Sequence, residues 1–142
     1  MDLREDTVPV IQKASSPVFE YSMPGVDTLP DTPHLSVRGL AAPSRGSTQT
    51  CVWRLTIAPN TPPRFGTVDH EEIFHVLRGA ADVKLDEELH SLSEGDTLIV
   101  PPNTTFGISN PHGESVEFVV VLPVGGMAHI PGEESFTPPW AQ

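Results

Sequence analysis

Two side chains that could exchange protons stand two residues apart near the middle of the chain, His70 and Glu72. Alternate side chains of an extended strand point to the same face, so this spacing predicts an imidazole beside a carboxylate. A histidine titrates at about pH 6.5, and a neighbouring carboxylate fixes its tautomer and stabilises its charged form. Such a pair can act as a general acid and base. The same spacing is equally typical of a hydrogen-bonded structural pair.

The chain from residue 34 onward reads as a series of short strands that would position this pair. Runs of β-branched and aromatic residues alternate with turn signals about every ten residues, which predicts an all-β sandwich or barrel. The expected strands span 34–40, 48–57, 72–77, 80–85, 88–92, 97–100, 104–109 and 115–122.

The two ends of the chain differ from this central part. Residues 1–33 are polar and rich in proline, which predicts an arm with one short strand at 18–21, able to wrap the body or be exchanged with a partner subunit. We expect residues 34–142 to form one barrel with an irregular tail. Phe136 and Trp140 should pin that tail.

Composition and charge exclude several classes of protein. The chain of 142 residues allows one domain, and its net charge of −11 disfavours binding to nucleic acids or to anionic membranes. A single cysteine excludes an internal disulfide and any CxxC zinc site. We find neither a long apolar stretch nor a signal-peptide core, so the expected location is the cytoplasm.

Two stretches resemble the paired motifs of the cupins, a family of jelly-roll barrels (double-stranded β-helices). In the first, Glu72 precedes Gly79 by seven residues, as in the cupin pattern. In the second, Gly95, Pro101 and Asn110 stand in the register of the family's second motif. The resemblance extends over roughly residues 34–140 and implies a small single-domain bacterial cupin related to the RmlC-like proteins.

The metal ligands of that family are mostly missing. The resemblance implies four ligands, a His-x-His pair, a glutamate and a last histidine, of which this chain keeps only the glutamate, Glu72. The last histidine position holds Phe106. The histidine pair would fall at Gly66 and Val68 in one alignment, or at Phe65 and Thr67 in the other. One carboxylate is too few for Fe, Mn or Zn, so we expect no metal cofactor.

Other residues could line a cavity and bind substrate. Trp53, Phe74 and Phe106 are the apolar candidates, and Arg38 and Arg54 are strand arginines that could bind an anion. An arginine in a barrel also pairs with acids, and Glu117 or Glu72 could be that partner.

The strand pattern also predicts where the other acids and histidines near the pair lie. Asp69 and Glu71 should face solvent, although Asp69 could orient His70 if the strand begins late. His75 has the opposite parity from Glu72 and should face outward, whereas His129 lies on a segment that could fold over the barrel mouth.

Three functions remain open. The first is a metal-independent enzyme of the isomerase, lyase (dehydratase) or cyclase type in a biosynthetic pathway, with His70 and Glu72 moving protons on a small organic metabolite. The second is a metal-dependent oxygenase with displaced ligands. The third is a ligand-binding cupin without turnover. The resemblance also implies a homodimer paired through its sheets.

Overall fold

A computed structural model describes residues 8–23 and 33–142, and nearly all of its regular structure is β. The strands are β1 (Val18–Tyr21), β2 (Leu35–Ala41), β3 (Thr50–Ile57), β4 (Thr67–Val68), β5 (Glu72–Arg78), β6 (Ala80–Leu85), β7 (Glu88–Ser93), β8 (Thr97–Val100), β9 (Phe106–Ser109), β10 (Val116–Pro123) and β11 (Ala128–His129). Two short 3₁₀ helices, η1 (Pro43–Arg45) and η2 (Pro139–Ala141), complete it. None of the helices described here is long and apolar enough to cross a membrane.

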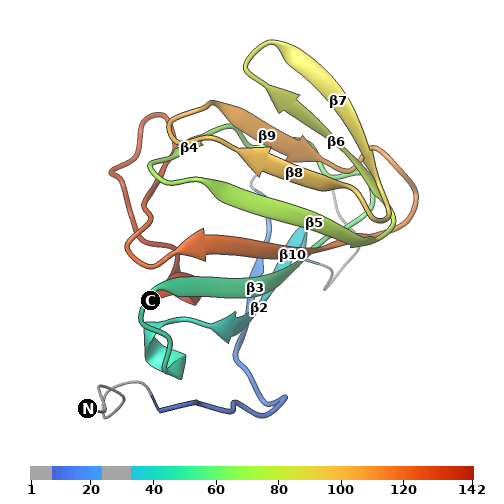
Figure 1. Cartoon of the computed structure of the whole chain (residues 1–142). Helices are drawn as coiled ribbons and strands as arrows, with labels where there is room; N and C mark the ends of the chain where they lie inside the picture. The colour runs from blue at the N-terminus through green and yellow to red at the C-terminus, as the bar shows by residue number, and fades with distance from the viewer. Residues whose placement is uncertain (1–7, 24–32) are drawn as a thin grey trace.

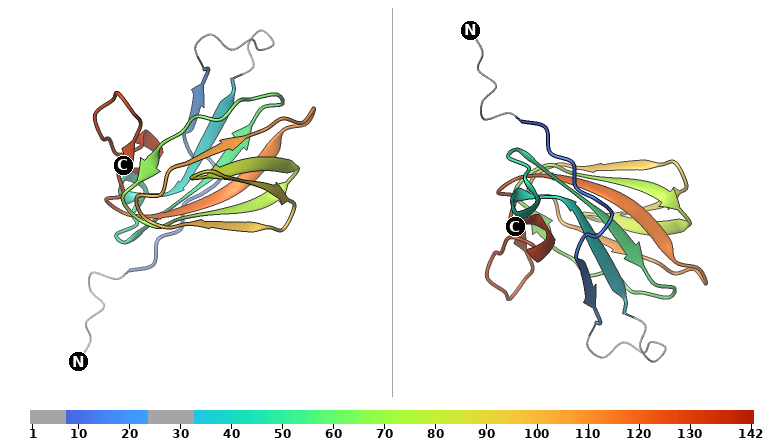
Figure 2. Two further views of the ribbon diagram at one scale, coloured as in Figure 1. Left: turned by 90° about the horizontal axis from the view of Figure 1, so that it is seen from above. Right: turned by 90° about the horizontal axis from the view of Figure 1, so that it is seen from below.

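The strands form antiparallel sheets that curve around a common interior (Figures 1 and 2). Six strands pair in the order β1-β2-β3-β10-β5-β8, three in the order β7-β6-β9, and two as β11-β4. An isolated bridge between Gly66 and Phe106 joins the β4 region to β9. This arrangement confirms the predicted all-β jelly roll.

The core lies between the sheets and follows the period-two pattern of the strands. On β5, Glu72, Phe74 and Val76 are buried, whereas the alternate residues Ile73 and His75 are partly exposed. One apolar cluster joins the buried side chains of both layers, and its largest fully buried member is Phe118 of β10. The inward position of Glu72 therefore follows from the same alternation that buries its apolar neighbours.

Every strand that we predicted is present, and the ends differ by at most two residues. The short strand at 18–21 is confirmed and pairs with β2 of the same chain. The rest of the predicted arm lies partly outside the described residues, and exchange of its strand between subunits stays a prediction. The sequence did not predict β4 and β11, because two-residue strands carry no periodicity.

The turn residues adopt the expected backbone. Gly79 and Gly95 have φ of 84° and 89°, and Asn103 has φ of 59°, all in the left-handed region. At Gly79 a side chain is also excluded by contact, because a Cβ would lie 2.6 Å from the carbonyl oxygen of Ser115.

The asparagine that ends the second motif stabilises three chain segments. Asn110 is fully buried, and its Nδ2 donates to the carbonyl oxygens of Ile57, Ala58 and Glu114 at 2.7–3.2 Å. Its Oδ1 accepts a bond from the backbone N–H of His112 at 3.0 Å.

Replacing this residue should leave several buried backbone groups without partners. We expect Asn110→Ala to lower the free energy of unfolding by about 2 kcal/mol. Urea denaturation monitored by tryptophan fluorescence measures this change, with Gln49→Ala, which removes an exposed side-chain amide, as the control. Equal stability of the two variants would contradict the structural role of the buried amide.

Candidate functional site

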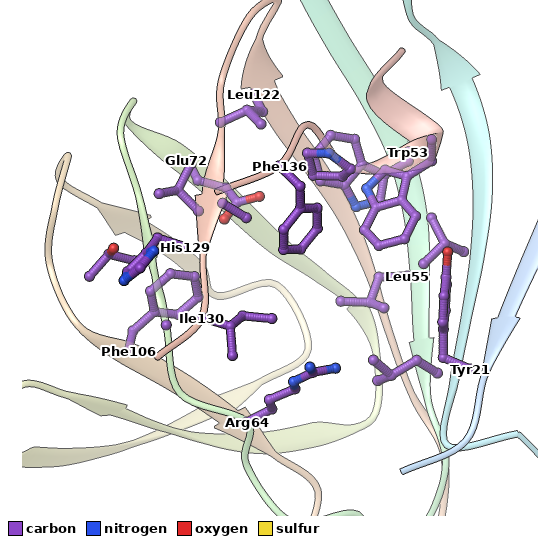
Figure 3. A pocket seen from close by; sticks show the side chains of 18 of the residues that line it. Tyr21, Trp53, Leu55, Arg64, Glu72, Phe106, Leu122, His129, Ile130 and Phe136 are labelled. Atoms are coloured by element: carbon purple, nitrogen blue, oxygen red, sulfur yellow. The ribbon is translucent and has the colours of Figure 1, made fainter. Parts of the chain in front are cut away.

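A cavity of about 400 Å³ opens between the sheets at the end of the barrel where β5 begins. Its walls are mostly aromatic and aliphatic, and they come from β1, β2, β3, the 64–68 segment, β5, β9, β10 and the C-terminal tail (Figure 3). The aromatic side chains are Tyr21, Trp53, Phe65, Phe74, Phe106, Phe136 and Trp140. A space of this size accommodates a small organic ligand.

Among the described residues that line this cavity, Glu72 is the only one with a carboxyl side chain. Its side chain is nine-tenths buried or more, with 6% of the residue exposed. Burial removes the hydration of the carboxylate and raises the pKa of Glu72 to about 8. At neutral pH most of this group is therefore the protonated acid, which can donate a hydrogen bond or a proton to a bound molecule.

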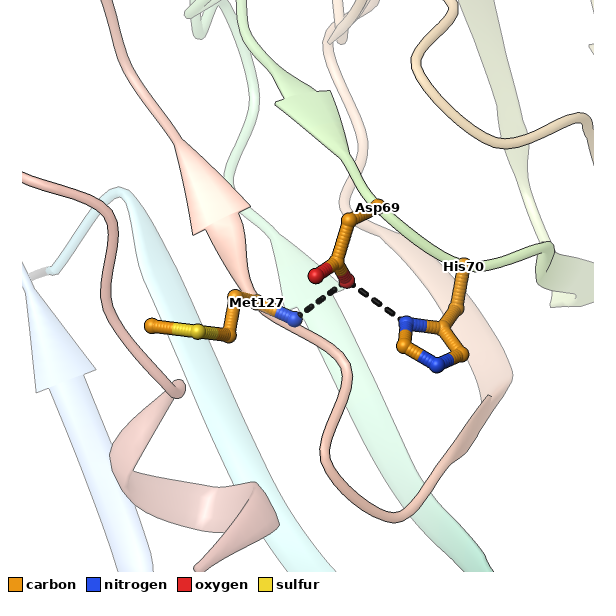
Figure 4. A network of polar contacts seen from close by, with 3 residues as sticks. All are labelled: Asp69, His70 and Met127. Carbon is orange, nitrogen blue, oxygen red and sulfur yellow. Dashed lines mark hydrogen bonds and ion pairs between the residues drawn. The ribbon is translucent and has the colours of Figure 1, made fainter.

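The structure places His70 away from Glu72, which corrects the geometry that we expected from their spacing. The chain bends at Asp69 and His70, and the strand begins only at Glu72, so the rule for alternate residues does not apply to the pair. His70 is half-exposed and lies outside the cavity lining. Its Nδ1 instead contacts Asp69 Oδ1 at 2.6 Å (Figure 4).

Asp69 therefore orients His70, as we expected for the case in which the strand begins late. Its Oδ1 also accepts the backbone N–H of Met127 at 2.7 Å (Figure 4). These bonds stabilise the charged form, the Met127 bond most, and hold the pKa of the Asp69 carboxyl below its ordinary value.

The other candidate residues divide between the cavity and the outer face of the large sheet. Trp53, Phe74 and Phe106 line the cavity, and Phe74 stacks edge-on against Phe106. Arg38 and Arg54 lie outside it on the outer face, which corrects our expectation that they reach a ligand there. Arg54 forms an ion pair with Glu117, the structural alternative that the sequence left open.

Several cavity residues come from the C-terminal tail, which the motifs do not cover. Phe136 and Trp140 line the cavity, and Trp140 packs against Trp53 and Tyr21 at ring distances of 6.0 and 5.6 Å. His129 also lines it, in keeping with the expectation that its segment folds over the barrel mouth. We did not predict Arg64, which ends a proline-rich loop and pairs with Glu133 at 2.8 Å.

The comparisons with known proteins agree with this geometry. A family model described as a cupin domain matches residues 53–122, a span that includes both motifs and Glu72. This is a small cupin-domain protein. A search of curated proteins found no match.

Solved structures share the cupin fold at low sequence identity. The polyketide cyclase RemF from Streptomyces resistomycificus has a TM-score of 0.67 at 16% identity, over 89% of this chain and 87% of that one. The ethanolamine utilization protein EutQ from Salmonella typhimurium has a TM-score of 0.53 at 22% identity, over 61% and 67%. Salicylate 1,2-dioxygenase from Pseudoaminobacter salicylatoxidans, in its gentisate adducts, has a TM-score of 0.61 at 15% identity, over 72% of this chain and 30% of that one.

The residues at the cupin metal positions do not fit a metal ion. Phe106 and the segment 65–68 all line the cavity beside Glu72, and they provide no imidazole. A Cβ at Gly66 would lie 2.7 Å from the carbonyl oxygen of His129, so this position has no room for a ligand side chain. Within residues 8–23 and 33–142, no group of three or more His, Cys, Asp or Glu side chains could hold a metal.

Proposed function

We propose that this cupin-domain protein is an enzyme that moves protons on a small, largely apolar organic molecule without a metal cofactor. The observation that carries the proposal is the carboxyl group of Glu72, buried among the aromatic walls of a ligand-sized cavity. Isomerisation, dehydration and cyclisation each need a group that takes up and returns a proton. An apolar cavity also excludes water from the reacting atoms.

The position of His70 changes the expected division of roles. Because His70 contacts Asp69 outside the cavity, we assign the proton transfer to Glu72 and give His70 no part in it. Trp53, Phe74 and Phe106 would bind the flat faces of the substrate. Aromatic side chains stack well on planar rings, so an aromatic or polyketide-like compound with an acidic C–H group suits these walls. That RemF is named a polyketide cyclase supports this substrate class.

A cupin oxygenase, the class that salicylate 1,2-dioxygenase represents, has less support because the donor set of the cavity does not fit a metal. A binding protein without turnover remains the second candidate, since the same apolar cavity would hold a ligand whether or not Glu72 reacts with it. The proton-transfer enzyme and the binding protein are both expected to bind a ligand, so only a proton-transfer assay separates these two candidates.

The ring opening of 5-nitrobenzisoxazole provides that assay. A base removes the proton from C3, the N–O bond breaks, and a nitrile and a coloured phenolate form without any further reagent. We expect the wild-type protein to accelerate this reaction at least about a hundredfold over the same concentration of acetate, because the cavity holds the carboxylate beside the ring and away from water.

Competition assigns the reaction to the cavity. We expect 2-naphthol to quench Trp53 and Trp140, which line the cavity, and to inhibit ring opening over the same concentration range. Leu55→Phe, which fills part of the space without adding a tryptophan, should weaken both effects. Binding of 2-naphthol without acceleration would favour the ligand-binding protein, and absence of both would refute a functional cavity.

A further inference from the structure

The outer wall of the cavity is a short hairpin of the C-terminal tail, residues 127–136, which we call the flap. Its two sides are joined by reciprocal backbone hydrogen bonds between Ala128 and Phe136, at 2.8 and 3.0 Å. Ala128, His129, Ile130 and Phe136 line the cavity. Part of the wall that faces a bound ligand therefore belongs to this one hairpin and not to the barrel itself.

The flap is attached to the barrel by few bonds. At its tip, Arg64 pairs with Glu133 in an exposed position. At its base, β11 pairs with the two residues of β4. Gly125 precedes the flap and has φ of 90°, a backbone conformation in which most other residues would be strained. Exposed ion pairs contribute little, so the base of the flap determines how firmly it is held.

Asp69 closes that base from two sides. Its backbone N–H donates to the carbonyl oxygen of Met127 at 3.1 Å, and its side-chain Oδ1 accepts the N–H of Met127 at 2.7 Å. His70 contacts the same Oδ1 and holds the carboxylate in this orientation (Figure 4). Asp69 thus continues the β4–β11 pairing by one residue with a bond between its side chain and the flap backbone.

We propose that Asp69 is a positioning residue, whose carboxylate holds the flap against the barrel and thereby sets how long a ligand stays in the cavity. The part that concerns ligands rests on the proposed function. Two independent contacts bring the flap to the same place. One is the pair of hydrogen bonds between Asp69 and Met127, which we call the clasp. The other is at Gly66, where the carbonyl oxygen of His129 lies so close that a Cβ would meet it at 2.7 Å.

Amide hydrogen exchange in the full chain tests the clasp without any ligand. We expect Asp69→Ala to speed exchange of the Met127 amide about tenfold or more, because a bond to a charged acceptor is lost. Asp69→Asn keeps a side-chain carbonyl oxygen as an acceptor and should restore most of the protection. Glu71→Ala removes a neighbouring exposed carboxylate and serves as the control. Unchanged amides in β10 verify that the variants are folded.

Ligand kinetics test the consequence. In stopped-flow fluorescence, we expect 2-naphthol to dissociate about tenfold faster from Asp69→Ala than from the wild type, whereas Asp69→Asn stays close to the wild type. In the ring-opening assay KM should rise more than kcat falls, because Glu72 itself is untouched. Gly66→Ala, which pushes the flap outward by direct contact, should reproduce the faster dissociation.

The outcomes separate the two proposals. Equal Met127 exchange in Asp69→Ala and the wild type would overturn the clasp. Faster exchange with unchanged dissociation would show that Asp69 holds the hairpin without positioning it for a ligand, which also overturns the proposal. If the wild-type protein binds no 2-naphthol, the proposed function fails, and the exchange comparison still decides whether Asp69 holds the flap.

Discussion

Replacing Glu72 with glutamine is expected to lower the rate of 5-nitrobenzisoxazole ring opening at least about a hundredfold. Glutamine keeps the size and the position of the side chain but cannot accept the C3 proton. The cavity, with its aromatic walls, should still bind 2-naphthol. The variant should therefore separate binding from proton transfer, with a large loss in kcat and a small change in affinity.

The pH dependence of the same reaction identifies the base. Only the ionised carboxylate removes a proton, and burial raises the pKa of Glu72 to about 8. The wild-type rate should therefore rise with pH and level off above about pH 8. A free carboxylic acid would already reach its plateau near pH 5 to 6, because its pKa is about 4.3.

Glu71→Gln provides the matched control for this experiment. Glu71 is the adjacent glutamate, it is exposed, and the same substitution replaces a carboxyl by an amide in the same segment. Its rate and its pH profile should equal those of the wild type. A Glu72→Gln variant as active as Glu71→Gln would refute the assignment of the base to the cavity.

The second large effect concerns stability, because a buried acid with a raised pKa makes folding depend on pH. In the unfolded chain the carboxyl of Glu72 ionises with a pKa of about 4.5, whereas in the folded protein it keeps its proton up to about pH 8. Between these values only the unfolded state releases this proton, so rising pH stabilises the unfolded state. The contribution of Glu72 to the free energy of unfolding should fall by about 1.4 kcal/mol per pH unit.

Urea denaturation at pH 5 and at pH 8 measures this contribution. We expect the wild-type protein to lose about 3 to 4 kcal/mol relative to Glu72→Gln between these two pH values. Subtracting the variant removes the effect of all other titrating groups, which the two proteins share. Parallel pH dependence of the two proteins would mean that Glu72 is hydrated in the folded state, contrary to its burial.

Part of the site was predictable because strand parity is a local property. The alternation around β5 places Glu72, Phe74 and Val76 on one face without any knowledge of the partner strands. The same rule, applied strictly to β3, separates Trp53 from Arg54. The structure shows this separation, with Trp53 buried and Arg54 exposed.

The separation of His70 from Glu72 was not predictable from their spacing. Pairing of the two side chains would require the strand to begin before His70, but the chain bends there. The bend goes with a long-range contact, since Asp69 bonds to Met127, which lies 58 residues away in the chain. No local pattern in residues 65–72 carries that information.

Short-range spacing and residue type were enough to predict the strands, because these depend on near neighbours along the chain. The resemblance to the cupin motifs implied the jelly-roll barrel and the inward direction of Glu72. The composition of the cavity depended on how distant segments pack. The tail brings His129, Phe136 and Trp140 to the barrel mouth, and their irregular segments have no periodicity to reveal it. The raised pKa of Glu72 likewise arises only when folding buries its carboxyl group away from water, so the chemistry of the site is a property of the folded chain.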